Sequence, residues 1–295
     1  MTVLVTGASG RAGRHVVDQL LLRGARVRAL TRDPAAARLP AAVEVVGGDL
    51  DRPATLDGLF DGIEAVHLIT VGAGYATLRT GPRIVELAQR AGVRRATVLW
   101  NGEPGPVEAA VAASALDWTC LEATDFMSNA LVWAPEIAAG EPVREAFADV
   151  RVAIVDEADV GAVAATLLTD ADALGAAGPR LTLTGPQPLS VRERVTAIGA
   201  QLGRELPFEQ LSEAQARERW RAAGTDEELI DLLVAWHSGP PPAATTPGDG
   251  VERVLGRPAG SFARWTAAHA DAFRVPAGSG GTAADTRGSG LEASS

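Results

Sequence analysis

The sequence contains no lysine, a single cysteine and a single tyrosine. All 27 of its basic residues are arginines, so no mechanism that depends on a lysine amine is open to the chain. Cys120 alone forms neither a disulfide nor a cysteine-based metal site within one chain, which favours a reducing, cytoplasmic location. Any chemistry that requires a phenol falls to Tyr75.

The chain also lacks basic surface and long apolar runs. It has 37 acidic residues against 27 basic ones, a formal net charge of −10 that would repel a nucleic-acid backbone. Although 46% of the residues are hydrophobic, no apolar run reaches membrane-spanning length. The first predicted strand begins at Thr2 with no basic segment before it, so we expect no secretory signal. These features predict a soluble globular protein with neither a nucleic acid nor a membrane as partner.

Histidine is sparse too, and its positions argue against a metal centre. The four histidines lie far apart in the chain, and none has the spacing of a metal ligand. They are His15, His67, His237 and His269. We therefore expect no metal site, whereas His237, beside a tryptophan in a late helix, is a candidate to face the substrate.

A glycine-rich turn directly follows the first predicted strand. Val3, Leu4 and Val5 have the apolar character of a strand buried on both faces. Glycines at positions 7, 10 and 13 follow, and an amphipathic helix is expected over residues 14–23. Such a turn brings bare backbone against a pyrophosphate, and the helix N-terminus adds N–H groups and partial positive charge. The pattern predicts dinucleotide binding.

Strands and helices alternate through the first 124 residues. Further strands are expected over residues 26–31, 43–46, 65–69, 96–100 and 118–122, and helices over residues 76–91 and 107–115. This alternation predicts an α/β fold of the Rossmann type, a doubly wound parallel sheet. Ligands then bind beyond the carboxyl ends of the strands.

Residues 125–276 are expected to form a smaller, mostly helical lobe on the substrate side, interleaved with the sheet. Helices are predicted over residues 127–138, 158–170, 191–202, 213–223, 227–237 and 261–273, and strands over residues 150–155 and 180–184. Its large apolar residues are expected mainly to pack, with one or two forming a lid: Met127, Trp133, Phe147, Trp220 and Trp236. Residues 277–295 offer nothing to bury, so we expect a disordered tail.

The residue that ends the second strand bears on the choice of cofactor. Arg32 stands where an arginine pairs with the 2′-phosphate of NADPH, and Arg11 and Arg14 can add a second guanidinium. In the alternative, Arg32 is a solvated loop residue and Asp33 binds the ribose of NADH. We expect NADPH rather than NADH.

Other cofactor contacts are expected after each of the following strands. Asp49 either accepts a hydrogen bond from the adenine or caps the next helix, and Thr70 and Val71 run beside the ribose. The full predicted set is Gly7, Ser9, Gly10, Arg11, Ala12, Gly13, Arg32, Asp49, Leu50, Thr70, Val71, Trp100, Ala123 and Thr124.

Several segments together resemble the atypical, NmrA-like branch of the short-chain dehydrogenase/reductase superfamily. They lie at residues 6–13, 28–34, 47–50, 117–122, 126–129 and 183–186. The resemblance runs from about residue 2 to 273. It implies either an NAD(P)H-dependent reductase of quinones, azo compounds or ketones, or a redox-sensing regulator. Ketoreductases that act on aromatic polyketides such as angucyclinones are one similar group.

One departure from that superfamily concerns its proton donor. Its orthodox members use a Tyr-x-x-x-Lys helix in which lysine lowers the pKa of the tyrosine. Here the lysine is missing, and only Arg79 mimics the spacing from Tyr75. Tyr75 lies in the loop after the fourth strand instead of on the helix after the fifth, so we prefer a role in the pocket wall.

Three residues remain as candidates for catalysis. Asn101, after the fifth strand, either hydrogen-bonds a substrate oxygen or makes a turn, while the preceding Trp100 either stacks on a flat ligand or packs in the core. Asp125, after the sixth strand, either is held protonated as an acid or caps the next helix, the more ordinary use. Ser128 is the third candidate.

These features predict an NADPH-dependent carbonyl reductase acting on a polycyclic aromatic ketone or quinone in antibiotic biosynthesis. Hydride transfer needs mainly proximity and orientation, but the product still needs a proton. A planar substrate with phenolic hydroxyls beside its ketone carries its own donor, so protonation could be substrate-assisted. Two alternatives fit the missing lysine equally well, a non-catalytic NAD(P)H sensor and a general quinone or azo reductase.

Overall fold

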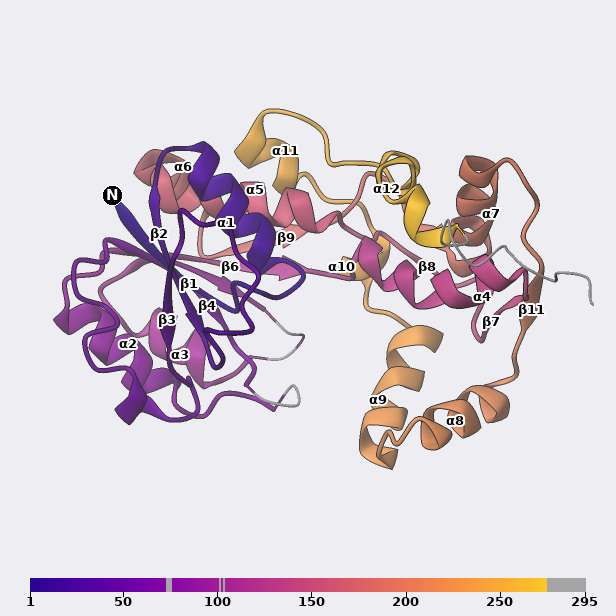
Figure 1. Ribbon diagram of the computed structural model, residues 1–295, viewed down its shortest axis with the longest axis horizontal. Coiled ribbons are helices and arrows are strands. Elements are labelled where there is room, and N and C mark those ends of the chain that lie inside the picture. The colour runs from indigo at the N-terminus through magenta and orange to yellow at the C-terminus, as the bar shows by residue number, and fades with distance from the viewer. Residues whose placement is uncertain (73–75, 101, 103, 275–295) are drawn as a thin grey trace, which may run out of the picture.

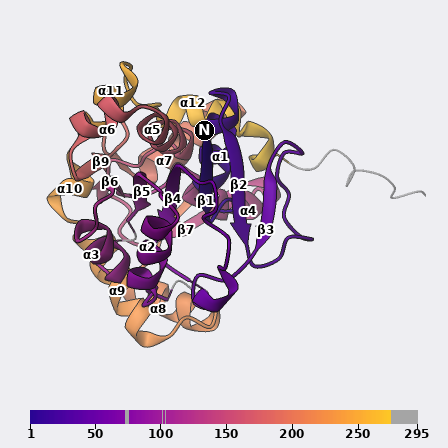
Figure 2. The same ribbon diagram turned by 90° about the vertical axis from the view of Figure 1, so that its left-hand side faces the viewer.

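The computed structural model describes residues 1–72, 76–100, 102 and 104–274. Seven parallel strands form its central sheet in the order β3-β2-β1-β4-β5-β6-β9 (Figures 1 and 2). The strands are β1 (Thr2–Thr6), β2 (Arg26–Thr31), β3 (Glu44–Gly47), β4 (Ala65–Ile69), β5 (Arg95–Leu99), β6 (Asp117–Ala123) and β9 (Arg180–Leu183). The predicted doubly wound Rossmann sheet is confirmed. The strand order reverses between β1 and β4, where dinucleotides bind in such folds.

Helices cover both faces of the sheet, as parallel strands require. The helices on one face are α1 (Gly13–Leu22), α5 (Glu157–Thr169), α6 (Ala171–Ala177) and α11 (Gly250–Leu255). The other face carries α2 (Gly81–Arg90), α3 (Pro106–Ala112) and the short 3₁₀ turn η1 (Pro53–Thr55). Because both faces are covered, the five residues of β1 are all buried.

The helix α5 lies directly against α1. A Cβ built at Gly161 would lie 2.5 Å from the backbone carbon of His15, so only glycine permits this close approach. Nearly all of the 13 residues of α5 are buried, which accounts for its apolar sequence. Among the described helices, none alone is long and apolar enough to cross a membrane. Only α5 and α6 together pass that test, and they meet at an angle of 116°.

Several elements differ from the sequence-based expectation in their bounds. α2 begins at Gly81 instead of residue 76, because Pro82 occupies its first turn and an isolated bridge joins Val71 to Thr77 before it. The strand expected over residues 150–155 is reduced to β8 (Arg151–Val152). The one-turn helix α10 (Pro242–Thr245) lies where no helix is expected, between the predicted helices over residues 227–237 and 261–273.

The chain returns to the sheet after leaving it at β6. β9 pairs in parallel with β6, and α5, α6 and α11 pack on the same side as α1. The stretch from residue 125 onward is therefore divided between the sheet layers and a separate lobe, seen on the right of Figure 1.

The lobe is built around its own core, which includes Met127, Trp133, Ile198 and Trp265. Its helices are η3 (Met127–Trp133), α4 (Ala134–Ala139), α7 (Val191–Leu202), α8 (Glu213–Ala222), α9 (Glu227–Ser238), α10, α12 (Phe262–Ala268) and η4 (Ala270–Phe273). Two small sheets pair β7 (Val143–Glu145) with β11 (Phe208–Gln210) and β8 with β10 (Leu189–Ser190).

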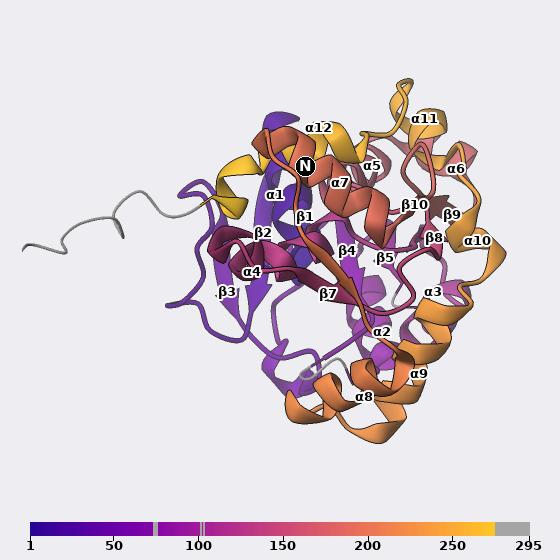
Figure 3. The same ribbon diagram turned by 90° about the vertical axis from the view of Figure 1, so that its right-hand side faces the viewer.

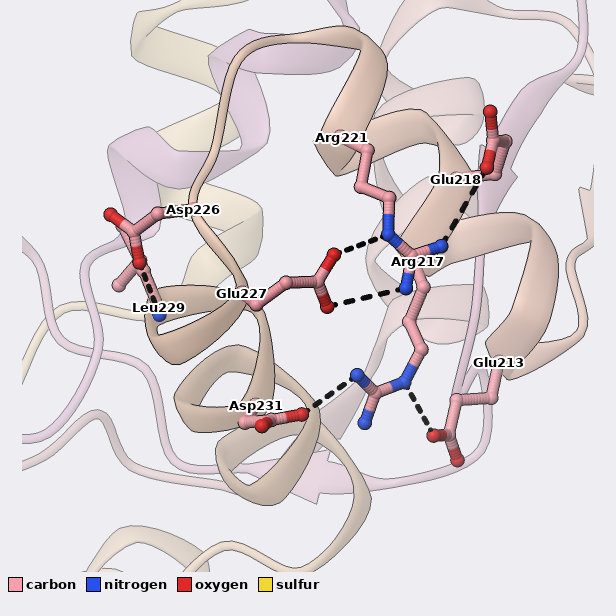
Figure 4. A network of polar contacts seen from close by, with 8 residues as sticks. All are labelled: Glu213, Arg217, Glu218, Arg221, Asp226, Glu227, Leu229 and Asp231. Atoms are coloured by element: carbon pink, nitrogen blue, oxygen red, sulfur yellow. Dashed lines mark hydrogen bonds and ion pairs between the residues drawn. The ribbon is translucent and has the colours of Figure 1, made fainter.

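The helices α8 and α9 form a hairpin at the lower edge of the lobe (Figure 3). Arg217 of α8 forms ion pairs with Glu213 one turn away and with Asp231 of α9, both below 3 Å (Figure 4). Arg221 bonds Glu227 at the start of α9 in the same way. These pairs link the two helices, so the hairpin presents one face to the rest of the lobe as a unit.

Candidate functional site

The glycine turn after β1 has the geometry that a pyrophosphate site requires. Gly7 adopts a φ of +63°, and a Cβ there would lie 2.8 Å from Cγ2 of Ile69. A Cβ at Gly13 would lie 2.0 Å from the carbonyl oxygen of Gly7, so the turn closes only with glycine at both positions. α1 starts at Gly13, and no side chain caps its first turn. The N–H groups of Arg14, His15 and Val16 donate to carbonyls of the turn itself, so the start of α1 offers an anion mainly its partial positive charge.

A cavity of about 330 Å³ lies beside this turn, at the carboxyl ends of β1 to β4. We call it the nucleotide cavity. Its walls consist of Gly7, Ser9, Leu30, Thr31, Arg32, Asp33, Ala36, Ala37, Gly48, Asp49, Leu50, Ile69, Val71 and Gly72. Six of the predicted cofactor residues thus meet in one place, and the turn, the cavity and the uncapped helix together fit a dinucleotide.

Arg32 and Asp33 differ in their freedom to bind a cofactor. The carboxylate of Asp33 accepts the backbone N–H groups of Ala35 and Ala36, at 3.0 and 3.2 Å, and so organises its own turn. Arg32 is exposed on the wall of the nucleotide cavity and forms no ion pair with a described residue. Its guanidinium can therefore turn toward a ligand.

Asp49 lines the nucleotide cavity, so its contact with the adenine stays a prediction. Its carboxylate accepts the N–H of Asp51 at 3.1 Å, but it does not cap the next helix, because Arg52 holds the N-cap position of η1 and no side chain caps it. Thr70, by contrast, is buried and donates a long hydrogen bond of 3.4 Å to the carbonyl of Leu99. Its neighbour Val71 lines the cavity.

The predicted cofactor residues after β5 and β6 do not line the nucleotide cavity. Trp100 is half-buried against the core, and the guanidinium of Arg180 lies 5.9 Å from its ring. Thr124 donates to the carbonyl of Ala153 at 3.1 Å, and Ala123 ends β6 beside it. Asn101 and Tyr75 lie outside the described residues.

A second cavity, of about 700 Å³, lies between the glycine turn and the lobe. We call it the lobe cavity. Its walls consist of Arg11, Arg14, Asp125, Ser128, Asn129, Leu131, Val132, Trp133, Glu145, Ala146, Phe147, Val191, Arg194, Leu211, Ala216, Arg219, Trp220, Ala223 and His237. The α8–α9 hairpin provides one wall, and the residues just beyond β6 provide another. Two predicted catalytic residues, Asp125 and Ser128, meet here.

Asp125 is largely buried in the wall of the lobe cavity, with its side chain 14% exposed. Its Oδ1 accepts the N–H of Phe126 at 2.9 Å and a hydrogen bond from the side-chain amide of Asn129, which in turn accepts one from Arg11. Burial raises the pKa of Asp125, although the charge of Arg194 and these hydrogen bonds oppose the shift. The helix-cap interpretation is wrong, because Phe126 holds the N-cap position of η3 and no side chain caps it.

Arg194 approaches Asp125 from α7. Its Nη1 lies 3.9 Å from Oδ2 of Asp125, and its side chain is only 8% exposed. The guanidinium also lies over the ring of Trp133, 5.6 Å from the centroid. Burial lowers the pKa of Arg194, opposed by the charges of Asp125 and Glu145. The guanidinium and the carboxyl of Asp125 therefore share one largely desolvated wall.

Other polar groups complete the lobe cavity. The hydroxyl of Ser128 is buried without a hydrogen-bond partner among the described residues. His237, predicted to face the substrate, lines the cavity and stacks on Trp220 with 6.2 Å between ring centroids. Desolvation lowers the pKa of His237, opposed by the charges of Asp125 and Glu145. Glu145 accepts a hydrogen bond from the indole of Trp133 at 2.8 Å.

The sequence analysis missed Arg194, Asn129 and Glu145. A signal for Arg194 exists, since it falls on the apolar stripe of α7 between Val191 and Ile198, where solvent-exposed residues are not expected. Asn129 and Glu145 carry no such signal. Their roles depend on contacts made across the lobe.

The sequence and fold match known reductases. Residues 7–101 match a family described as NAD(P)H-binding. The chain is 34% identical over 285 residues to a (4-alkanoyl-5-oxo-2,5-dihydrofuran-3-yl)methyl phosphate reductase of Streptomyces griseus, covering 92% of this chain and 99% of that one. It is 30% identical over 287 residues to an NAD(P)H azoreductase of Xenophilus azovorans, with the same coverage.

The chain belongs to the NmrA-like, NAD(P)H-binding branch of the atypical short-chain dehydrogenase/reductases. This oxidoreductase also shares its fold with the NADPH complex of a quinone oxidoreductase from Escherichia coli. That structure has a TM-score of 0.75 at 21% identity, over 90% of this chain and 99% of that one. The predicted NAD(P)H-dependent oxidoreductase is confirmed, whereas the angucyclinone ketoreductase group is not the one that these relatives represent.

Proposed function

We propose that this oxidoreductase reduces a conjugated acceptor, namely a quinone, an azo compound or an α,β-unsaturated lactone, with NADPH as the hydride donor. Its relatives act on azo and dihydrofuranone substrates, and its structural neighbour is a quinone reductase. These acceptors share one property. A hydride added at one end of the π system leaves a negative charge delocalised onto oxygen or nitrogen at the other end.

The observation that carries this proposal is the position of the largely desolvated carboxyl of Asp125 on the wall of the lobe cavity. No lysine is available to activate a phenol, so the site lacks the orthodox means of protonating a localised alkoxide. A delocalised enolate or phenolate is far less basic and needs only a modest acid. The buried carboxyl of Asp125, with its raised pKa, is such an acid on the wall of the lobe cavity.

The residues of the chain then have separate tasks. The glycine turn and α1 hold the pyrophosphate, and Arg32 binds the 2′-phosphate, since Asp33 is occupied in its own turn. Bound NADPH supplies the hydride, so that two electrons enter the acceptor and NADP⁺ remains. Asp125 gives its proton to the oxygen or nitrogen that gains charge and recovers a proton from solvent.

A polycyclic quinone satisfies this chemistry, so the expected planar aromatic substrate stays within the proposed class. The redox-sensor alternative predicts instead that cofactor binds without any turnover. Simple ketones separate the conjugate reductase from a general ketoreductase, because hydride addition at their carbonyl carbon yields a localised alkoxide.

The test follows NADPH absorbance with 1,4-naphthoquinone, methyl red and an acyl-substituted 2(5H)-furanone, each against an enzyme-free reaction. The aryl ketone 1-tetralone, whose reduction at the carbonyl carbon yields a localised alkoxide, serves as the matched control. We expect oxidation with at least one conjugated acceptor, none with 1-tetralone, and a loss of about 100-fold in kcat for Asp125→Asn. Asp149→Asn, an exposed carboxylate in the lobe, should behave as wild type. Reduction of 1-tetralone at a comparable rate, or cofactor binding without turnover of any acceptor, would overturn the proposal.

A further inference from the structure

Arg194 is buried without the hydrogen bonds that a buried guanidinium normally makes. Its side chain is 8% exposed, and its Nε has no partner among the described residues. The nearest carboxylate oxygen, at 3.9 Å, is too far away for a hydrogen bond. A guanidinium has five N–H donors, and leaving them unpaired in a desolvated site is costly.

A purely structural ion pair in this protein looks different. Asp159 is also buried, but its two oxygens accept the guanidinium of Arg257 at 2.7 Å and the N–H of Gly260 at 2.6 Å. The oxygen of Asp125 that accepts hydrogen bonds is used by Phe126 and Asn129, not by Arg194. The fold therefore holds the Arg194 guanidinium in place while leaving its donors available.

Arg194 lines a cavity in which basic residues outnumber acidic ones, with four arginines against Asp125 and Glu145. Arg11 and Arg14 line the same cavity, and neither forms an ion pair with a described carboxylate. Such a concentration of positive charge is unusual in a chain with a net charge of −10. An anion drawn to the cavity would meet Arg11 and Arg14 at the turn and Arg194 deeper in the lobe.

We propose that Arg194 binds an anionic substituent of the acceptor, a phosphate monoester or a carboxylate, and so positions the conjugated group beside Asp125. This assignment rests on the proposed reductase function. A guanidinium fork matches both groups in a bidentate geometry. The anchor lies on α7 in the lobe, well separated along the chain from the glycine turn that holds the cofactor.

Matched pairs of acceptors test the anchor separately from the reductase activity. One pair is the butenolide methyl phosphate and its free alcohol, and the other is a 1,4-naphthoquinone bearing a propanoate and its methyl ester. Turnover of the neutral members reports the reductase, and the anionic-to-neutral ratio of kcat/KM reports the anchor. Comparison of the two pairs distinguishes phosphate from carboxylate as the favoured group.

The variants are Arg194→Met, Arg194→Lys and the control Arg192→Met. Arg192 lies two residues away on α7, but its guanidinium packs over Phe208 and pairs with Asp149. We expect Arg194→Met to lower the anionic-to-neutral ratio of kcat/KM by about 30-fold or more, whatever its effect on turnover of the neutral acceptor. Arg194→Lys should recover part of the loss, and Arg192→Met should match wild type.

Cofactor titration and cooperative unfolding show whether each variant is folded. If Arg194→Met does not fold, Arg194→Lys, which keeps the positive charge, replaces it in the test. An equal loss for anionic and neutral acceptors would overturn the anchor and leave the reductase standing. If no acceptor oxidises NADPH, calorimetric binding of each pair in the presence of NADP⁺ replaces turnover. Equal affinity of wild type for the charged and neutral members would then refute the anchor.

Discussion

The guanidinium of Arg194 lies beside the carboxyl of Asp125 without bonding to it, with 3.9 Å between Nη1 and Oδ2. The arginine comes from α7 in the lobe, and the aspartate directly follows β6 of the sheet. The pair therefore joins the two parts of the molecule at the lobe cavity. Because the guanidinium is not bonded to the carboxylate, each group remains able to act on a ligand.

The pH dependence of stability reports the state of Asp125. Burial raises its pKa, so the folded protein holds the proton more tightly than the unfolded chain does. The free energy of unfolding of wild type, relative to Asp125→Asn, should fall as the pH rises from about 4 through the raised pKa. Urea unfolding at a series of pH values measures this difference. A difference that grows in favour of wild type with rising pH would contradict the assignment.

His67 should produce the opposite dependence. It is fully buried in β4, and burial lowers its pKa to about 4. The unfolded chain binds the proton more readily, so wild type loses stability as the pH falls from about 6.5 toward 4. The loss relative to His67→Gln should reach about 3 kcal/mol. Chemical unfolding of both proteins between pH 4 and about 6.5 measures this loss. A free energy of unfolding that changes equally with pH in wild type and His67→Gln would count against the prediction.

Cofactor preference depends on Arg32 in this account. Arg32→Gln should weaken NADPH binding by about 10- to 100-fold and leave NADH binding unchanged, because only NADPH carries the 2′-phosphate. Fluorescence titration with both cofactors measures the two affinities. Arg26→Gln, at the opposite end of β2, is the matched control. Equal weakening for NADPH and NADH would show that Arg32 does not bind the phosphate.

The close contact between α1 and α5 makes Gly161 sensitive to substitution. An added Cβ would lie 2.5 Å from the backbone of His15, so Gly161→Ala should destabilise the protein by about 1–3 kcal/mol. Gly175 of α6 has open space around it, and Gly175→Ala should stabilise by about 0.5–1 kcal/mol. Thermal unfolding of the two variants should therefore shift in opposite directions. A shift in the same direction for both variants would mean that α1 and α5 can move apart to accommodate the added methyl group.

The cofactor half could be predicted because its signals are local. The glycine turn, the strand before it and the helix after it are contiguous, and Arg32 follows directly from the end of β2. The position of Asp125 after a strand makes it a candidate from the sequence alone. The extent to which its side chain is buried cannot be predicted in the same way. That depends on Arg194, which lies 69 residues further along the chain, and on the packing of the lobe.

Other misses have similar causes. α2 starts five residues later than predicted because Gly81 and Pro82 form its first turn. This local signal is present in the sequence, but the prediction followed the apolar periodicity instead. The two-residue strands β8 and β10 pair only with each other, so neither has a pattern that could be recognised alone. Short elements of this kind form where tertiary contacts place them.

The central claim is that hydride reaches a conjugated carbon, and isotope transfer tests it most directly. The enzyme would be supplied with NADPH deuterated at the transferring position and with the 4-alkanoyl butenolide methyl phosphate. Mass spectrometry and NMR would then locate the label. The account predicts one deuterium on the ring carbon that bears the phosphomethyl group, with the alkanoyl ketone intact. Deuterium on a new carbinol carbon, or no transfer at all to this or the quinone acceptor, would contradict it.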